Sequence, residues 1–299
     1  MGAECYISCP VPGLDWLPPR LLLDGGMGTS LIARGLELDR EPPEAWNLRQ
    51  PDLVREIHRR FIEAGAGAVQ TNTFGGNRVR LARYGLASEV EPICRAAVAL
   101  ARSVAPEGVF VFGSIGPTGA LPPPEGDADL GELEDAFAEQ AAALGDAGVD
   151  LIHLETFYHP KEMRAALRGC RIGASPVPVV ASVACAAPRP GVATFTTVLG
   201  FPADAVIGVA LEERADGVGV NCGLVPTDLI PFVERLVART RLPVFAQPIV
   251  APSTGPPLYP GEFAAGVAAL FDAGARVVGG CCGTSPTDLA AAHDVLALQ

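Results

Sequence analysis

Short runs of Val, Ile, Leu and other apolar residues recur along the chain, and each precedes a loop and a longer amphipathic stretch. Runs that are continuously apolar are typical of strands buried on both faces. In stretches such as residues 51–65 and 131–148, apolar residues recur at spacings of three and four, which predicts helices. Gly65, Gly148 and Gly274 end such stretches, as glycines often do at helix C-termini. The eight predicted strands lie within residues 20–26, 67–72, 109–114, 150–155, 177–183, 216–221, 242–247 and 275–280.

This alternation predicts an α/β fold in which helices cover a parallel sheet. Eight repeats favour a closed (β/α)8 TIM barrel, with an open doubly wound sheet as the alternative. Residues 1–20 lack the pattern and are interpreted as an irregular N-terminal leader, so a single barrel domain is expected over residues 21–299. The proline-rich segments 119–127 and 248–260 follow the third and seventh strands and are expected to be long loops at the barrel mouth.

Composition and charge narrow the possible partners. Hydrophobic residues make up 49% of the chain and aromatic residues only 6%, which suits a large core of small aliphatic side chains. The formal net charge of -12, without a long basic run, argues against nucleic acid and against anionic membrane surfaces as partners. No secretory signal pattern is apparent near the N-terminus, so we expect a cytoplasmic protein whose cysteines are thiols or metal ligands. A small-molecule substrate is the expected partner.

Polar residues gather where the predicted strands end. In a (β/α)8 barrel the C-terminal ends of the strands carry the active site, so we expect these side chains to surround one site. Each residue alone could instead be a helix cap or a loop residue with satisfied hydrogen bonds, and for Asp24 a helix N-cap is the specific alternative. The set comprises Asp24, Thr71, Asn72, Ser114, Glu155, Ser182, Asn221, Cys222, Gln247, Cys281 and Cys282.

Three of these residues are cysteines on neighbouring strands. Cys222 ends the sixth predicted strand, and Cys281 and Cys282 end the eighth, so their thiols should meet near the end of the seventh. Three thiolates suit a tetrahedral zinc ion with a fourth position left open for a substrate. Buried unreactive thiols and a redox pair are the alternatives. On zinc a substrate thiol would lose its proton at neutral pH and become reactive in alkyl transfer.

The motifs "LLLDGGMGT", "TNTFGGN", "GSIGPTG", "LETF", "GVNCG" and "GGCCGT" together resemble the zinc-dependent homocysteine S-methyltransferase family. They are most similar to the homocysteine-binding module of cobalamin-dependent methionine synthases. The resemblance implies a (β/α)8 barrel in which Cys222, Cys281 and Cys282 bind Zn²⁺ and activate L-homocysteine. It further implies a substrate site in which Asp24 and Glu155 receive the ammonium group and the backbone near Gly25 and Gly26 faces the carboxylate. Asn221 and Ser182 are also assigned to this substrate site.

The resemblance leaves the methyl donor open. Betaine-using relatives carry tyrosine after the glutamate, whereas this chain has Thr156, and the segment "QPIVAP" after the seventh strand also departs from the family. Residues 285–299 are expected to form one helix, so methylcobalamin, favoured as the donor, would be free or carried by a separate corrinoid or folate-linked protein. S-methylmethionine is the rival donor. A non-catalytic zinc-binding or thiol redox-sensing barrel protein is the alternative function.

Overall fold

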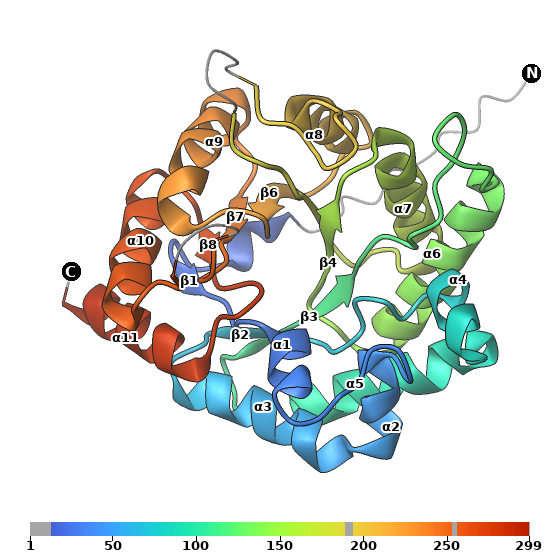
Figure 1. Cartoon of the computed structure of the whole chain (residues 1–299), viewed down its shortest axis with the longest axis horizontal. Coiled ribbons are helices and arrows are strands. Elements are labelled where there is room, and N and C mark those ends of the chain that lie inside the picture. Colours follow the sequence, from blue (N-terminus) through green and yellow to red (C-terminus); the bar gives the residue numbers. More distant parts are fainter. Residues whose placement is uncertain (1–12, 189–193, 253–255, 299) are drawn as a thin grey trace, which may run out of the picture.

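The computed structural model describes residues 13–188, 194–252 and 256–298 and places eight parallel strands in one barrel. From β2 to β8 each strand pairs with the next in sequence, and β1 pairs with β8, with Leu21 opposite Val277. A parallel bridge between Leu23 and Ala68 closes the ring between β1 and β2. The (β/α)8 barrel prediction is therefore confirmed (Figure 1). The strands are β1 (Leu21–Leu22), β2 (Ala68–Gln70), β3 (Phe110–Ile115), β4 (Leu151–Phe157), β5 (Val179–Val183), β6 (Gly217–Asn221), β7 (Val244–Gln247) and β8 (Val277–Val278).

Helices surround the strand ring, as Figure 1 shows. Both stretches with helical spacing form helices, α3 and α6, and Gly65, Gly148 and Gly274 adopt the positive φ angles expected just beyond helix ends. The α-helices are α1 (Met27–Ile32), α2 (Trp46–Arg49), α3 (Pro51–Glu63), α4 (Arg78–Leu81), α5 (Val90–Arg102), α6 (Leu130–Ala147), α7 (Pro160–Gly173), α8 (Ala203–Glu212), α9 (Pro226–Arg239), α10 (Pro260–Asp272) and α11 (Pro286–Ala297). Short 3-10 helices cover Leu14–Trp16, Pro43–Ala45, Ala82–Tyr84 and Ala87–Glu89.

Two hydrophobic cores hold the layers together, one between strands and helices and one inside the barrel. The inner core includes large side chains such as Phe112 and Phe245, whose ring centroids are 6.4 Å apart. Leu14 and Leu17 belong to this inner core and are 3% and 2% exposed, so the 3-10 helix before β1 packs onto the barrel. Residues 1–12 of the predicted leader, with Cys5 and Cys9, lie outside the described residues.

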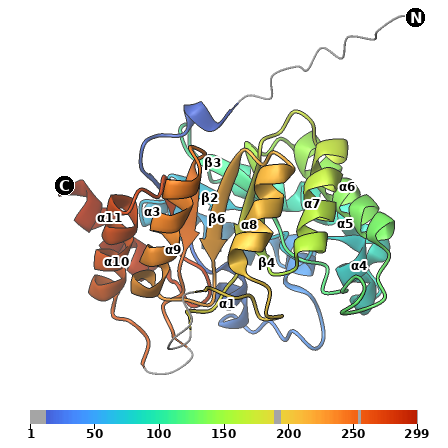
Figure 2. The same ribbon diagram turned by 90° about the horizontal axis from the view of Figure 1, so that it is seen from above.

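The long loops and α1 lie at the end of the barrel opposite this 3-10 helix (Figure 2). They follow the C-terminal ends of the strands, so the loops after β3 and β7 lie at the barrel mouth, as predicted. Within the described residues, no helix combines the length and the apolar character that crossing a bilayer would need.

Candidate active site

Three thiols meet at the barrel mouth. The sulfur atoms of Cys222, Cys281 and Cys282 all lie within 4.8 Å of one another, and the sulfurs of Cys222 and Cys282 are 3.9 Å apart. The end of β7 lies between them, because the Cys222 N–H donates to the Gln247 carbonyl at 2.9 Å and the Cys281 N–H donates to the Pro248 carbonyl at 2.8 Å. The segment "QPIVAP", a departure from the family pattern, thus fixes the backbone of both thiol-bearing loops.

The glycines around the thiols are required by close packing. A Cβ on Gly280 would lie 2.2 Å from Thr284 Cγ2, and one on Gly279 would lie 2.7 Å from the Asp24 carbonyl oxygen. Gly283 has a φ of 82°, in the left-handed region that favours glycine. The backbone can therefore turn directly after β8 and direct two successive cysteines toward the mouth.

The three sulfurs form a donor set that could hold one metal ion. Hydrogen bonds to Cys222 and Cys282, together with burial, raise the pKa of the Cys281 thiol. Hydrogen bonds with Cys222 and Cys281 lower the pKa of the Cys282 thiol, so one thiolate forms and opposes ionisation of the other two thiols, whereas a divalent cation between them would favour ionisation of all three. The side chains present therefore fit a soft divalent metal with sulfur ligands.

Glu155 lies beside the thiols and is held from three sides. Its Oε1 accepts hydrogen bonds from Gln70 Nε2 at 2.9 Å and from the Ser114 hydroxyl, and its Oε2 lies 3.5 Å from Asn221 Nδ2. Burial raises the pKa of this carboxyl to about 7, although the Ser114 hydrogen bond opposes the shift. A cationic group placed here would stabilise the ionised carboxylate.

Gln70 connects Glu155 to a chain of buried polar side chains. Its amide nitrogen donates to Glu155, and its Oε1 accepts from Gln247 Nε2 at 2.5 Å. Gln70 Nε2 also lies 3.3 Å from His153 Nδ1, so this ring nitrogen accepts the hydrogen bond. The other ring nitrogen, His153 Nε2, then carries the proton and donates to the Ser182 hydroxyl at 2.7 Å. Ser182 is fully buried and does not line the cavity, which differs from its assignment to the substrate site.

Asp24 faces the interior and not the open cavity. It is 1% exposed, its Oδ2 accepts the Gln70 backbone N–H at 2.9 Å, and its Oδ1 has no hydrogen-bond partner among the described residues. Burial raises the pKa of its carboxyl well above the usual value. The N-cap residue of α1 is Gly26, so Asp24 is not the cap of that helix.

Gly25 and Gly26 line the cavity, but the Gly26 N–H already donates to the Thr284 carbonyl at 3.1 Å. Asn221 lies behind the wall, where its Oδ1 accepts the Thr156 N–H at 2.7 Å and its Nδ2 donates to Thr156 Oγ1 at 2.7 Å. Asn221 therefore positions Thr156, which lines the cavity directly.

A cavity of about 400 Å³ extends outward from the thiols. Its outer wall contains residues that the sequence did not assign to the site, because they lie in loops and short helices and not at strand ends. Motif position signalled some of the unassigned lining residues: Met27 and Thr29 lie within "LLLDGGMGT", and Phe74 lies within "TNTFGGN". These outer residues are Met27, Ile32, Leu38, Pro42, Pro43, Glu44, Phe74, Arg80 and Tyr84, whereas Thr29, also unassigned, lies beside the thiol-bearing loop, where its hydroxyl accepts the Gly283 N–H at 3.2 Å.

Comparison with known proteins gives consistent matches over nearly the whole chain. The family model described as homocysteine S-methyltransferase matches residues 21–296. Methionine synthase of Mycobacterium tuberculosis is 33% identical over 92% of this chain, and methionine synthase of Mycobacterium leprae is 32% identical over 91%. These matches span only 24% of each synthase.

Among solved structures, a homocysteine methyltransferase is also similar to this chain. The metallated form of the homocysteine methyltransferase MmuM from Escherichia coli superposes with a TM-score of 0.75 and 26% identity, covering 93% of this chain and 96% of that one. The carboxyl transferase domain of Rhizobium etli pyruvate carboxylase, at 16% identity and a TM-score of 0.53, shares the fold alone.

Proposed function

Because the chain belongs to the homocysteine S-methyltransferase family, we propose that it transfers a methyl group to the thiol of L-homocysteine and forms methionine. The observation that carries this proposal is the joint placement of three thiols and a carboxylate, Glu155, at one end of a cavity of about 400 Å³. The thiols suit a metal that binds a substrate sulfur, and the carboxylate suits the ammonium group of an amino acid.

The proposed metal is zinc, held by Cys222, Cys281 and Cys282. Three sulfur ligands in close contact favour a soft, tetrahedral ion and leave one position for a further sulfur. When bound, zinc would lower the pKa of the homocysteine thiol and supply a thiolate at neutral pH.

The proposed role of Glu155 is to accept the ammonium group of homocysteine. Gln70 and Ser114 hold its Oε1, so the carboxylate presents a fixed direction to the substrate. Asp24 is proposed to act through Gln70: it accepts the backbone N–H of Gln70 and so helps to hold the side chain that bonds Glu155. The backbone at Gly25 and Gly26, which line the cavity at the start of α1, is proposed to face the substrate carboxylate.

The sequence leaves two candidate methyl donors open, methylcobalamin and S-methylmethionine. Methylcobalamin would be free or carried by a corrinoid or folate-linked protein that docks over the barrel mouth. The proposed location of the reaction is the cytoplasm, where the ligand thiols stay reduced.

A non-catalytic zinc-binding or thiol redox-sensing protein would use the same cysteines. Such a protein has no need for Glu155 or for the polar side chains that hold it, so the carboxylate beside the thiols favours the methyltransferase.

The deciding experiment is calorimetric titration of the zinc-loaded chain with L-homocysteine, before and after zinc is removed by a chelator. We expect binding accompanied by proton release, and loss of binding after chelation. Methionine formation is then measured with each donor in turn. Absence of homocysteine binding, or binding that survives complete metal removal, would contradict the proposal and favour the zinc-binding or redox-sensing protein.

A further inference from the structure

The outer wall of the cavity carries one acidic and one basic side chain over the same glycine. Glu44, in the 3-10 helix Pro43–Ala45, accepts the Gly75 N–H through Oε1 at 2.5 Å. Arg80, in α4, lies with its guanidinium 5.2 Å from the centre of the Phe74 ring, and its Nη1 donates to the Pro117 carbonyl at 3.3 Å. A Cβ on Gly75 would lie 2.9 Å from Arg80 Nε and 3.0 Å from Glu44 Oε1, so both side chains flank that glycine.

Both side chains line the cavity, and neither takes part in an ion pair in the part of the chain that the structure describes. Glu44 is only 3% exposed, and its burial raises the pKa of its carboxyl, while backbone N–H groups, that of Gly75 among them, and then the charge of Arg80 oppose this shift. A buried carboxylate such as that of Glu44 is stabilised by a cationic partner. The planar guanidinium of Arg80 can bind the carboxylate of a ligand through two parallel hydrogen bonds. A ligand with an ammonium group and a carboxylate on one carbon would complement both.

The cavity already has a separate carboxylate beside the thiols. Glu155 lies next to Asn221, whose Nδ2 is 4.0 Å from Cys281 Sγ, so it belongs to the inner end. Glu44 and Arg80 contact Gly75, Phe74 and Pro117 at the outer wall instead. One cavity therefore contains two places that suit the charged end of an amino acid.

We propose that Glu44 and Arg80 bind the α-ammonium and α-carboxylate groups of the methyl donor, and that this donor is an amino acid carrying a sulfonium group. The inference rests on the proposed methyl transfer to homocysteine. It selects between the donors that the sequence left open, because a corrin ring presents no α-amino acid to this pair.

The cavity walls also suit this chemistry. The thiolate sulfur of homocysteine forms a bond to the methyl carbon, and the bond from that carbon to the donor sulfur breaks with its electron pair remaining on the donor. The thiolate becomes a thioether and the sulfonium becomes a second thioether, so opposite charges cancel. Apolar walls such as Met27, Ile32 and Leu38 favour a step that removes charge, because they solvate the charged reactants poorly.

The test uses the zinc-loaded chain, saturating homocysteine and three sulfonium donors. S-methyl-L-methionine carries both α-groups, γ-(dimethylsulfonio)butyrate has the same chain with only the carboxylate, and trimethylsulfonium carries neither. We expect Arg80→Gln to raise KM about ten- to hundredfold for the first two donors and leave the third unchanged, since a charge-assisted pair is lost. Glu44→Gln should raise KM by a similar factor for S-methylmethionine alone. KM for homocysteine should stay unchanged in both variants.

The matched control is Arg83→Gln, an exposed arginine close in sequence whose Nη2 donates to the Gly119 carbonyl at 3.0 Å and which does not line the cavity. It should behave as the parent chain, and Arg80→Lys should show a smaller KM increase than Arg80→Gln. Binding of S-methylmethionine to the same proteins, measured by calorimetry without homocysteine, gives a readout independent of turnover.

Several outcomes would overturn the inference. Equal losses with all three donors would mean that the two residues support the fold, and a raised KM for homocysteine would mean that they bind homocysteine itself. Methionine formed from methylcobalamin but from no sulfonium would reject the inference and keep the proposed function. Binding of S-methylmethionine without methyl transfer from any donor, methylcobalamin included, would instead reject the proposed function.

Discussion

Two non-glycine residues beside the thiols, Thr156 and Cys222, adopt left-handed backbone conformations with φ of 64° and 62°. Such a conformation costs roughly 1 to 2 kcal/mol per residue, so the surrounding hydrogen bonds must hold it. Asn221 bonds both the N–H and the hydroxyl of Thr156, and the Cys222 N–H donates to the end of β7. The turn after β6 thus directs Cys222 toward the other thiols.

Removing one thiol should weaken metal binding sharply. In Cys222→Ser and Cys281→Ser a hard hydroxyl replaces a soft sulfur, and the remaining two sulfurs cannot complete the proposed three-ligand site. We expect zinc content after dialysis to fall well below that of the parent chain. Cys170→Ser, at a buried thiol in α7, is the control that should keep its zinc. Full zinc retention in either site variant would refute the assignment of the metal ligands.

Neutralising Glu155 should separate substrate binding from metal binding. Glu155→Gln removes the charge that receives the ammonium group, which corresponds to about 1.5 to 3 kcal/mol, or about ten- to hundredfold in the Kd for homocysteine. Zinc content should not change, since the three thiols remain. Calorimetry with homocysteine checks this, with the exposed Glu139→Gln as control. An unchanged Kd would mean that the carboxylate faces another group.

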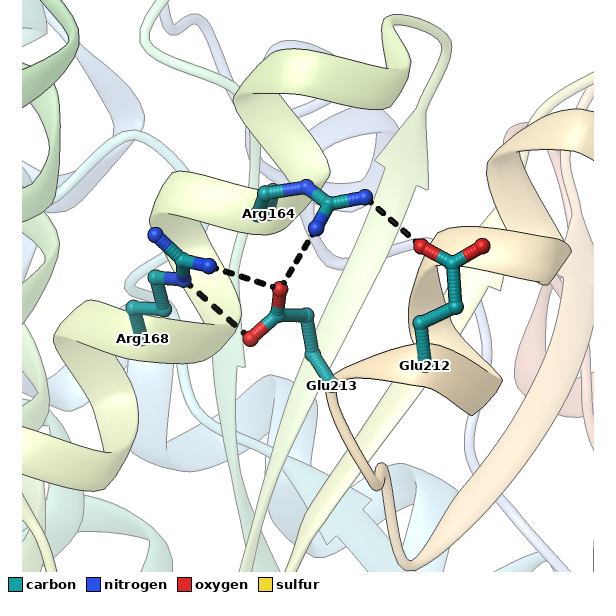
Figure 3. Close-up of polar contacts among 4 residues, drawn as sticks. All are labelled: Arg164, Arg168, Glu212 and Glu213. Carbon is teal, nitrogen blue, oxygen red and sulfur yellow. Dashed lines mark hydrogen bonds and ion pairs between the residues drawn. The ribbon is translucent and has the colours of Figure 1, made fainter.

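At the scale of elements, α7 and the C-terminal end of α8 are joined by a cluster of ion pairs (Figure 3). Glu213, directly after α8, accepts from Arg164 at 2.8 Å and from Arg168 at 3.1 Å, whereas Glu212 pairs with Arg164 alone at 2.7 Å. Arg168, then Arg164, lowers the pKa of the Glu213 carboxyl. The cluster links two helices that cover neighbouring strands.

Glu213→Gln should destabilise the chain by about 0.5 to 1 kcal/mol, because the arginines are partly exposed and solvent screens their charges. Glu212→Gln, which removes one pair, should cost less. Urea unfolding at low salt and at about 1 M salt checks the origin of the effect, since salt should shrink the difference. The contribution should also be lost at acid pH. A carboxyl whose pKa is lowered by folding stabilises the folded chain at pH values above its pKa in the unfolded chain, and this stabilisation disappears as pH falls and the folded carboxyl is protonated. A loss from Glu213→Gln that does not depend on salt would point to packing instead.

At the scale of the whole molecule, a fully buried histidine couples stability to pH. Both ring nitrogens of His58, in α3, lack a hydrogen-bond partner among the described residues, and burial lowers the pKa of the ring to about 4. The folded chain therefore holds this ring neutral, while the unfolded chain protonates it below about pH 6.5. Stability from this group is present above that pH and is lost as pH falls toward 4.

His58→Leu should remove this dependence. The stability of the parent chain relative to the variant should fall by about 3 kcal/mol between pH 7 and pH 4, because only the parent carries a depressed histidine pKa at this position. Urea unfolding of both proteins across this range measures the difference. Other buried groups, His153 among them, are the same in both proteins and cancel. Parallel stability curves would show that His58 does not titrate in this way.

The sequence alone determined the eight strands, their parallel order and the gathering of Cys222, Cys281 and Cys282. Apolar periodicity is a local property, and in a (β/α)8 barrel the end of each strand has a fixed place on the rim. Strand alternation therefore placed the thiols without any knowledge of distant contacts. The four histidines do not share the strand ends that carry the thiols, and this too was visible from the sequence.

Only the tertiary structure decided which rim residues face the cavity and what forms its outer wall. Asp24 and Ser182 end strands as expected, yet their side chains bond to Gln70 and His153 in the interior. Glu44 and Arg80 are 36 residues apart in sequence and come from segments outside the strands, so no periodic pattern relates them. Their meeting over Gly75 follows from how the loops after β1 and β2 pack on the rim, and side-chain direction and loop packing depend on contacts that the sequence does not record locally.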